Sequence, residues 1–251
     1  MAPNLLILAG TTEATVLARA VAERGLTGTV SFAGRVERPL RQPLPQRVGG
    51  FGGVDGLVRY LREAGITHVI DATHPFAVQM SRNAVAACAE AGVPLVALTR
   101  PAWQPVEGDR WERVPDIAGA VAALDRARLR VMLAVGRMHL PDFAPNPQHF
   151  YVLRLVDPPA ADLPFPDAEV IVDRGPFDEA SDKRLMEAHG IELVVSKNSG
   201  GTGAYAKIAA ARSLGLPVLM IDRPAQPERL ELHDVGAVFD WLAHTGTALG
   251  V

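Results

Sequence analysis

Cysteine is almost absent from this 251-residue chain, in which Cys88 is the only one. An intrachain disulfide and a cysteine-based metal site are therefore excluded, and this scarcity fits a reducing compartment. Cys88 falls in an apolar helical run over residues 84–91, where a small core residue is expected rather than a nucleophile.

Long apolar runs are missing as well. No stretch approaches the roughly 20 apolar residues of a membrane span, and residues 1–4 lead into a strand without the features of a signal peptide. The net charge of −3 and the pI near 6.2 argue against a general binder of nucleic acid or of acidic membranes. We expect a cytoplasmic protein, for which a monomer is plausible.

Common sequence motifs for a metal site, a catalytic nucleophile or a Walker phosphate loop are also missing. The seven histidines show no His-x-x-x-His or Glu-x-x-His spacing, so no metal site is expected. Neither a Gly-x-Ser-x-Gly elbow nor a Walker loop is present. Catalysis is therefore expected to depend on a bound cofactor, which the protein orients and surrounds with charge.

Apolar strand patterns alternate with helical patterns along the whole chain. Strands are predicted at 5–9, 29–33, 67–71, 94–98, 130–135, 150–155, 168–172, 193–196 and 217–221. This alternation predicts an α/β protein with two doubly wound, Rossmann-like domains and parallel sheets. A connector at 103–115 places the domains at 1–102 and 103–251, although the final helix, 235–244, could pack on the first domain.

The two halves also resemble each other at a nearly constant offset. The matching segments are Leu61–Ile66 with Met186–Ile191, Gly92–Val96 with Gly215–Leu219, Arg100-Pro101 with Arg223-Pro224, and Leu6–Gly10 with Met132–Gly136. The repeat pairs the loop at 73–77 with that at 197–203, and 10–13 with 136–140. All four loops follow strands, and ligands bind at the carboxyl ends of strands in such sheets. We expect the two domains to form a cleft.

The loop Gly10-Thr11-Thr12-Glu13 is the first candidate phosphate site, because it joins a strand to a helix start. It lacks the full Gly-x-Gly-x-x-Gly pattern, and Glu13 would have to turn away or cap the helix. An ordinary N-cap is the alternative. Gly34-Arg35 ends the next strand, where an Arg accommodates the 2′-phosphate of NADP; a solvated Arg is the alternative.

The segment 71–77 presents His74 and Phe76 on a turn that Pro75 fixes. His74 could donate a proton or bind a carboxylate, and Phe76 could stack on a flat ring. A histidine that only bonds to backbone is the alternative. Ser81, Arg82 and Asn83 add polar groups on the following helix.

The stretch from Lys197 to Lys207 contains two of only three lysines in the chain. Its glycines and hydroxyls suggest a loop that meets the cofactor through Asn198, Ser199 and backbone N–H groups. The two lysines would then point toward an anionic substrate. A loop that needs small residues for packing is the alternative.

Four strings of this sequence together resemble the precorrin-6A reductase family of cobalamin biosynthesis. They are 6–14 (LILAGTTEA), 71–77 (DATHPFA), 98–103 (LTRPAW) and 196–201 (SKNSGG) with Tyr205-Ala206-Lys207. Two small departures are Gly203-Ala204, where a Thr often precedes the Tyr, and Ala9, which replaces a Gly. The resemblance implies NADPH-dependent reduction of one double bond in the precorrin-6A macrocycle to give precorrin-6B, with both ligands between the two domains.

The resemblance and the patterns together assign the site residues. For catalysis, His74, Tyr205 and water are the candidate proton donors. The cofactor would contact Gly10, Thr11, Thr12, Glu13, Gly34, Arg35, Thr73, Asn198, Ser199, Gly200 and Gly201. The anionic macrocycle would contact Phe76, Ser81, Arg82, Arg137, Lys197 and Lys207. An NADP-dependent reductase of another substrate and a non-catalytic, two-lobed nucleotide-binding regulator remain as alternatives, because fold does not determine substrate.

Overall fold

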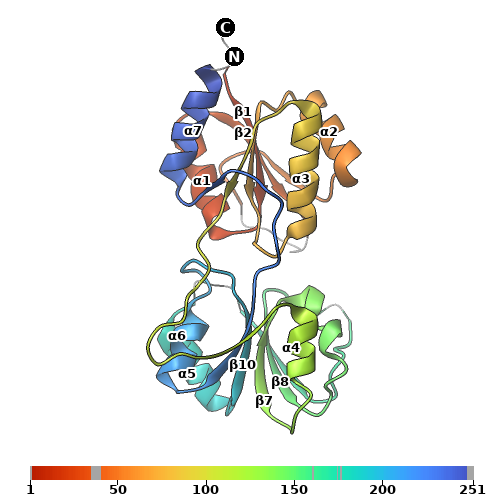
Figure 1. Ribbon diagram of the computed structural model, residues 1–251, viewed down its shortest axis with the longest axis vertical. Helices are drawn as coiled ribbons and strands as arrows, with labels where there is room; N and C mark the ends of the chain where they lie inside the picture. The colour runs from red at the N-terminus through yellow and green to blue at the C-terminus, as the bar shows by residue number, and fades with distance from the viewer. Residues whose placement is uncertain (1, 35–40, 160, 174, 176, 248–251) are drawn as a thin grey trace. The chain divides into compact units, whose positions relative to one another are not determined.

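The computed structural model describes residues 2–34, 41–159, 161–173, 175 and 177–247, and only the backbone at 246 and 247 (Figure 1). These residues form two compact units. The first consists of the described residues up to Pro101 and from Ala225 onward, and the second runs from Ala102 to Pro224. The chain therefore leaves the first unit once and returns to it near its end.

The described part of the first unit is built on six parallel strands in the order β12-β5-β4-β1-β2-β3. The strands are β1 (Asn4–Ala9), β2 (Thr27–Phe32), β3 (Gln46–Val48), β4 (His68–Ala72), β5 (Leu95–Leu98) and β12 (Glu231–Leu232). The helices are α1 (Thr12–Glu23), α2 (Gly53–Glu63), α3 (Val78–Ala91) and α7 (Val235–Thr247). No helix in the described part of the chain is long and apolar enough to cross a membrane.

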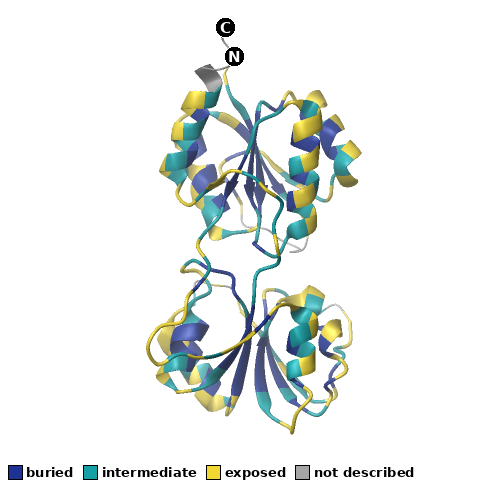
Figure 2. Cartoon of the chain, viewed as in Figure 1, coloured by how far each residue is buried: buried dark blue, intermediate teal, exposed yellow. Residues whose placement is uncertain are grey.

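Both faces of this sheet are covered by helices, which is why its central strands are continuous apolar runs. In β1, Leu5 and Ile7 pack with α1 and α7 on one face. Leu6 and Leu8 point to the other face and pack with α2 and α3. Figure 2 shows these strands as the most buried part of the unit.

The described part of the second unit repeats this plan, with six parallel strands in the order β6-β11-β10-β7-β8-β9. The strands are β6 (Arg110–Val114), β7 (Arg130–Ala134), β8 (Phe150–Leu155), β9 (Ala168–Val172), β10 (Leu193–Lys197) and β11 (Pro217–Ile221). The helices are α4 (Ile117–Ala123), α5 (Glu179–Ala188) and α6 (Ala206–Ser213), with 3₁₀ turns η1 (Arg137–His139) and η2 (Pro141–Phe143). The predicted class, two doubly wound units with parallel sheets, is confirmed.

The sixth strand of each sheet comes from the other half of the sequence. After β5 the chain enters the second unit and forms β6 beside β11; after β11 it returns and forms β12 beside β5. The prediction that 103–251 forms one domain is therefore wrong for 225–251, because β12 pairs with β5 and α7 packs on α1. The alternative prediction, in which the final helix at 235–244 packs on the first domain, describes this placement.

The predicted pairing of the loops at 10–13 and 136–140 holds only in part. Both follow the central first strand of their sheet, β1 or β7. After β1 the chain enters the three-turn helix α1, whereas after β7 the described residues form only the short turns η1 and η2. Of these two loops, only the one after β1 leads into the N-terminus of a full helix, which is a potential anion site.

Candidate functional site

The loops after β1 and β4 lie side by side in the first unit. In this strand order, β1 and β4 flank the point where the direction of the sheet connections reverses, and ligands bind there in open α/β sheets. A Cβ added at Gly10 would lie 3.5 Å from the backbone N of His74. A glycine at this position therefore places no side chain between the two loops.

The first loop closes onto its own helix through Thr11. Its Oγ1 accepts a hydrogen bond from the N–H of Ala14 at 3.3 Å and donates to the carbonyl of Ala72 at 2.9 Å. Thr11 is thus the N-cap of α1 and ties the loop to the end of β4. The Thr11 hydroxyl is already hydrogen-bonded within the protein, so Thr11 would bind an anion through its backbone rather than through its side chain. Gly10 and Thr12 are exposed at the same edge.

Glu13 is not an obstacle to a bound anion. Its Oε2 lies 2.5 Å from Nη1 of Arg100, which follows β5, and both side chains are largely buried. The ion pair neutralises the carboxylate beside the N-terminus of α1. This helix terminus, the adjacent glycine and the compensated acid together fit a pyrophosphate group.

Asp71, near the end of β4, anchors the loop that follows this strand. Its Oδ1 accepts from both the N–H and the hydroxyl of Thr73, at 3.1 and 2.6 Å, and its Oδ2 accepts from the hydroxyl of Ser81 at 2.6 Å. Ser81 is 1% exposed. Direct substrate contact by Ser81 stays a prediction that this burial does not favour, and the Thr73 hydroxyl is hydrogen-bonded inside the protein.

His74 is set in one orientation by its own loop. Its Nδ1 accepts from the N–H of Phe76 at 3.2 Å, and its carbonyl accepts from the N–H of Ala77 at 2.7 Å. An acceptor at Nδ1 places the proton of the neutral ring on Nε2. The ring lies 5.7 Å from that of Phe76, and both residues are partly buried, while Arg82 is exposed on α3.

Gly34 lies just after β2, exposed and with a φ of +77° that favours glycine. A Cβ there would meet Cγ1 of Val48, at the end of β3, at 3.5 Å. Arg35, the predicted partner of a 2′-phosphate, lies outside the described residues.

In the second unit, Asn198 after β10 is a structural residue. Its amide accepts from the N–H of Trp103 at 2.8 Å and donates to the carbonyl of Trp103 at 3.0 Å. Trp103 in turn donates its indole N–H to the carbonyl of Gly201 at 2.7 Å. The predicted cofactor contact of Asn198 stays a prediction that the geometry of its side chain does not favour, because both ends of the amide are engaged and the residue is 4% exposed.

The rest of this loop keeps its form through backbone and neighbouring groups. Gly200 and Gly201 both have positive φ, at 69° and 67°, which only glycine adopts in succession at little cost. Arg223 donates to the carbonyls of Asn198 and Ser199, each at 3.0 Å. Ser199 is 8% exposed and Lys197 is partly buried, whereas Arg137 is exposed after β7, the neighbouring strand.

Lys207 is a buried side chain of the second unit. It is 5% exposed, donates through Nζ to the carbonyl of Ala204 at 2.7 Å, and lies over the Trp103 ring at 5.3 Å from its centre. Burial lowers the pKa of Lys207 to about 8, an effect that nearby Arg154 increases and Asp182 opposes. The predicted substrate contact of Lys207 stays a prediction that its burial does not favour, because α6 turns this residue into the interior of the unit.

The proposed catalytic role of Tyr205 fits the structure poorly. Its hydroxyl lies 3.0 Å from Nη1 of Arg212, in the last turn of α6, and Arg212 also pairs with Asp109, just before β6. Parallel strands begin at the opposite edge of the sheet from the ligand loops. The hydroxyl therefore points toward the strand starts rather than toward the candidate site.

Four residues that sequence reasoning missed hold these loops: Arg100, Trp103, Arg223 and Arg229. All lie in the segments that connect the units: Arg100 and Arg223 open the repeated string Arg-Pro-Ala at 100–102 and 223–225, Trp103 follows its first copy, and Arg229 lies beyond its second copy. That repeat is the signal that could have found the first three, since it marks equivalent positions after β5 and β11.

The buried lysine leads to a pH prediction. Between pH 8 and about 10.5, unfolded chains bind a proton at Lys207 that folded chains have lost, so the free energy of unfolding rises with pH. We expect the free energy of unfolding of wild type minus that of Lys207→Met to increase by up to about 3 kcal/mol over that range. Urea unfolding of both proteins from pH 7.5 to 10.5 measures it. A difference that stays constant with pH would contradict the buried position.

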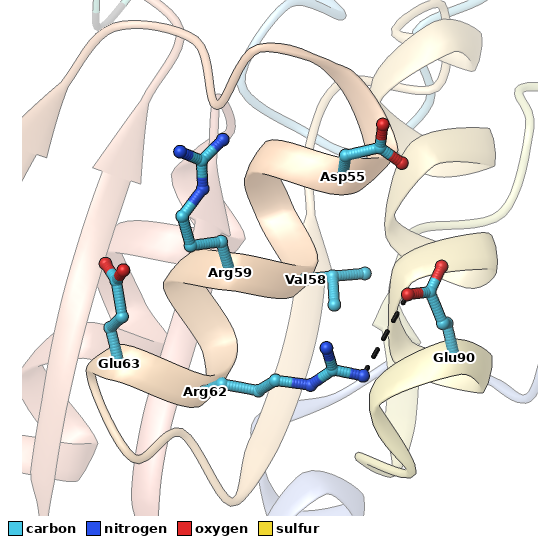
Figure 3. Close-up of a pocket in the computed structure, with 6 residues that line it drawn as sticks. All are labelled: Asp55, Val58, Arg59, Arg62, Glu63 and Glu90. Carbon is cyan, nitrogen blue, oxygen red and sulfur yellow. Dashed lines mark ion pairs between the residues drawn. The ribbon is translucent and has the colours of Figure 1, made fainter.

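The surface also carries a depression of about 430 Å³ between α2 and α3 (Figure 3). Its lining is Asp55, Val58, Arg59, Arg62, Glu63 and Glu90. Arg62 and Glu90 approach only to 3.9 Å and are more than half exposed, so their pairing contributes little. None of the predicted site residues lines this depression.

Comparison with known proteins gives matches over nearly the whole chain. A family model described as precorrin-6x reductase CbiJ/CobK matches residues 4–243. The chain is 56% identical over 249 residues to the precorrin-6A reductase of Rhodobacter capsulatus, covering 99% of each protein. It is 42% identical over 241 residues to that of Rhodococcus erythropolis, covering 95% of this chain and 97% of the relative.

More distant and structural matches agree. The cobalt-precorrin-6A reductase of Priestia megaterium is 30% identical over 252 residues, covering 96% of each protein. A solved structure named CobK precorrin-6A reductase matches with a TM-score of 0.95 at 56% identity, over 97% of each chain. From the family model, these relatives and the shared fold, we conclude that the chain belongs to the precorrin-6x reductase family.

Proposed function

We propose that this chain catalyses the NADPH-dependent reduction of one double bond in precorrin-6A to give precorrin-6B, a step of cobalamin biosynthesis. The observation that carries the proposal is the 56% identity, over 99% of both proteins, to a relative named precorrin-6A reductase. The relatives at 56% and 42% identity are named for precorrin-6A, and the one at 30% for cobalt-precorrin-6A. This ordering favours the cobalt-free macrocycle as substrate.

The first unit is the proposed cofactor site. Gly10 and the N-terminus of α1 would hold the pyrophosphate, with Arg100 compensating Glu13. Gly34 lies just after β2, and Arg35, the next residue in the sequence, is the proposed partner of the 2′-phosphate. When bound, the cofactor supplies the hydride for the reduction.

The proton is the contribution that the chain itself must make. We assign its delivery to Nε2 of His74, because the N–H of Phe76 occupies Nδ1 and leaves Nε2 as the proton-bearing atom; water returns a proton to Nε2, so that the ring ends the step neutral as it began. Phe76, beside this ring, provides a flat apolar surface for the macrocycle. Arg82, Arg137 and Lys197 are the proposed partners of its carboxylates.

Anaerobic mixing of the protein with NADPH and precorrin-6A tests the function. We expect NADPH absorbance to fall in step with conversion of the macrocycle, and to fall more slowly with cobalt-precorrin-6A. A folded preparation that oxidises no NADPH with either macrocycle would overturn the proposal. It would favour the regulator alternative if NADPH still bound.

The cofactor choice is tested by Arg35→Ala in the same assay. Loss of a charge-assisted bond to the 2′-phosphate should raise the KM for NADPH roughly 10- to 100-fold and leave that for NADH nearly unchanged. Arg41→Ala removes the same charge from the same loop and serves as the matched control, expected to leave the ratio of the two KM values as in wild type. Equal losses for both cofactors with Arg35→Ala would reject the role of Arg35.

A further inference from the structure

The carboxylate of Asp71 has a fourth partner, which comes from the far end of the chain. Nη1 of Arg229 lies 2.5 Å from Oδ2 of Asp71, and the two side chains are 6% and 1% exposed. One buried carboxylate therefore joins the end of β4, the loop at Thr73, helix α3 at Ser81 and the segment before β12.

The backbone around Arg229 is fixed next to β4. The carbonyl of Leu230 accepts from the N–H of Ala97 at 2.8 Å, and β12 continues this pairing along β5. Because β5 is the neighbour of β4, the guanidinium reaches the end of β4 from the adjacent strand. Gln226, in the same segment, donates to the carbonyl of Pro75 at 2.5 Å. The returning segment thus holds the His74 loop at two points.

Stability alone is a weak reason for such an arrangement. A buried ion pair often contributes no more than apolar residues of the same volume would, because both charges lose their hydration. What apolar residues could not reproduce is the geometry, in which four donors converge on the two oxygens of one carboxylate. The loop that this carboxylate holds at Thr73 also contains His74.

We propose that Arg229 is a positioning residue for the reduction: its pair with Asp71 holds residues 73–76 so that Nε2 of His74 faces the reacting atoms. This inference rests on the proposed function, and Arg229 itself touches neither ligand. With this role, Arg229 affects activity from the segment that returns from the second unit, and not from the loops after β1 and β4.

The test compares Arg229→Gln and Arg229→Lys with wild type in steady-state kinetics and in ¹⁵N NMR of labelled histidine. We expect Arg229→Gln to lower kcat/KM for precorrin-6A about 10- to 100-fold, as small misplacements of catalytic groups do. Arg229→Lys should restore part of this loss, because it keeps the charge. The ¹⁵N signals of His74, assigned with His74→Asn, should change from a fixed Nε2–H tautomer to an averaged ring in Arg229→Gln.

The matched control is His68→Asn, at the opposite end of the same strand. His68 is 2% exposed and bonds only to Thr67 and Thr245, at 2.9 and 3.0 Å, within the described residues. This variant should lose stability but keep the kinetic constants and the His74 signals of wild type. A merely structural Arg229 would behave in the same way, so wild-type kcat/KM and His74 signals in folded Arg229→Gln would overturn the proposal.

Ser81→Ala decides the matter if both Arg229 variants fail to fold. It removes one donor to Asp71 and leaves the charge pair intact, so it should fold, lower kcat/KM several-fold and disturb the His74 signals. An unchanged rate and spectrum would count against the proposal. If wild type fails to oxidise NADPH with precorrin-6A, the proposed function falls, and the NMR comparison still decides whether Arg229 orders the loop.

Discussion

Replacing His74 by asparagine should lower kcat for precorrin-6A reduction by about 10²- to 10⁴-fold, the range expected when a general acid is lost. Asparagine is the informative substitution because its side-chain oxygen can accept from the N–H two residues on, as Nδ1 of His74 does from Phe76. The loop therefore keeps its internal hydrogen bond, while the proton donor at Nε2 disappears. The KM for NADPH should change little.

Single-turnover mixing under anaerobic conditions, in H₂O and in D₂O, measures this effect. Wild type should show a solvent isotope effect on macrocycle reduction if proton transfer contributes to the rate. Tyr205→Phe is the comparison that separates the two candidate donors. Its hydroxyl is bound to Arg212 along α6, so its loss should leave the single-turnover rate near that of wild type. A wild-type rate in His74→Asn would assign the proton to water instead.

The alternation of strands and helices was sufficient to predict the fold class, because each central strand is a continuous apolar run covered on both faces. It failed at three short or edge strands, β3, β6 and β12. The strand β6 lies at an edge of its sheet and reads Arg-Trp-Glu-Arg-Val, of which only Val114 is buried, so it has no apolar run. The strand β12 has two residues, too few for any pattern. The exchange of sixth strands therefore could not be read from periodicity.

Sequence reasoning placed the candidate loops at the strand ends but did not predict the contacts that several side chains make there. Ser81 and Asn198 are polar residues in the right place, yet their partners are Asp71 and the backbone of Trp103. Such contacts depend on the tertiary fold, which the local pattern does not contain. The burial of Lys207 was missed for a different reason: α6 is buried around much of its circumference, so no polar face marks which residues point outward.

Trp103→Ala should lower the free energy of unfolding of the second unit by about 3–5 kcal/mol, as loss of a core tryptophan does. The side chain is 8% exposed and belongs to the core that Met132, Val194 and Ile208 form. Its ring also meets Tyr205 edge-on at 5.6 Å and underlies the ammonium of Lys207. Truncation would leave a cavity, and the buried cation would lose its aromatic contact.

Two conservative variants divide this loss into packing and hydrogen bonding. Trp103→Phe keeps a ring but removes the indole N–H that binds the carbonyl of Gly201, at an expected cost of about 1 kcal/mol beyond the smaller ring. Trp111→Phe is the matched control in the same core, because the indole N–H of Trp111 is buried without a partner among the described residues. Removing that group should cost less than the same change at Trp103, and can even stabilise the unit.

Urea unfolding followed by far-UV circular dichroism measures all three variants without relying on the fluorescence of the replaced residue. Hydrogen exchange over residues 197–203 should accelerate in Trp103→Ala, because Trp103 holds this loop through Asn198 and Gly201. Equal losses for Trp103→Phe and Trp111→Phe would show that the indole bond contributes nothing to stability. A loss below about 0.5 kcal/mol in Trp103→Ala, the range of most surface substitutions, would mean that Trp103 does not hold the β10 loop.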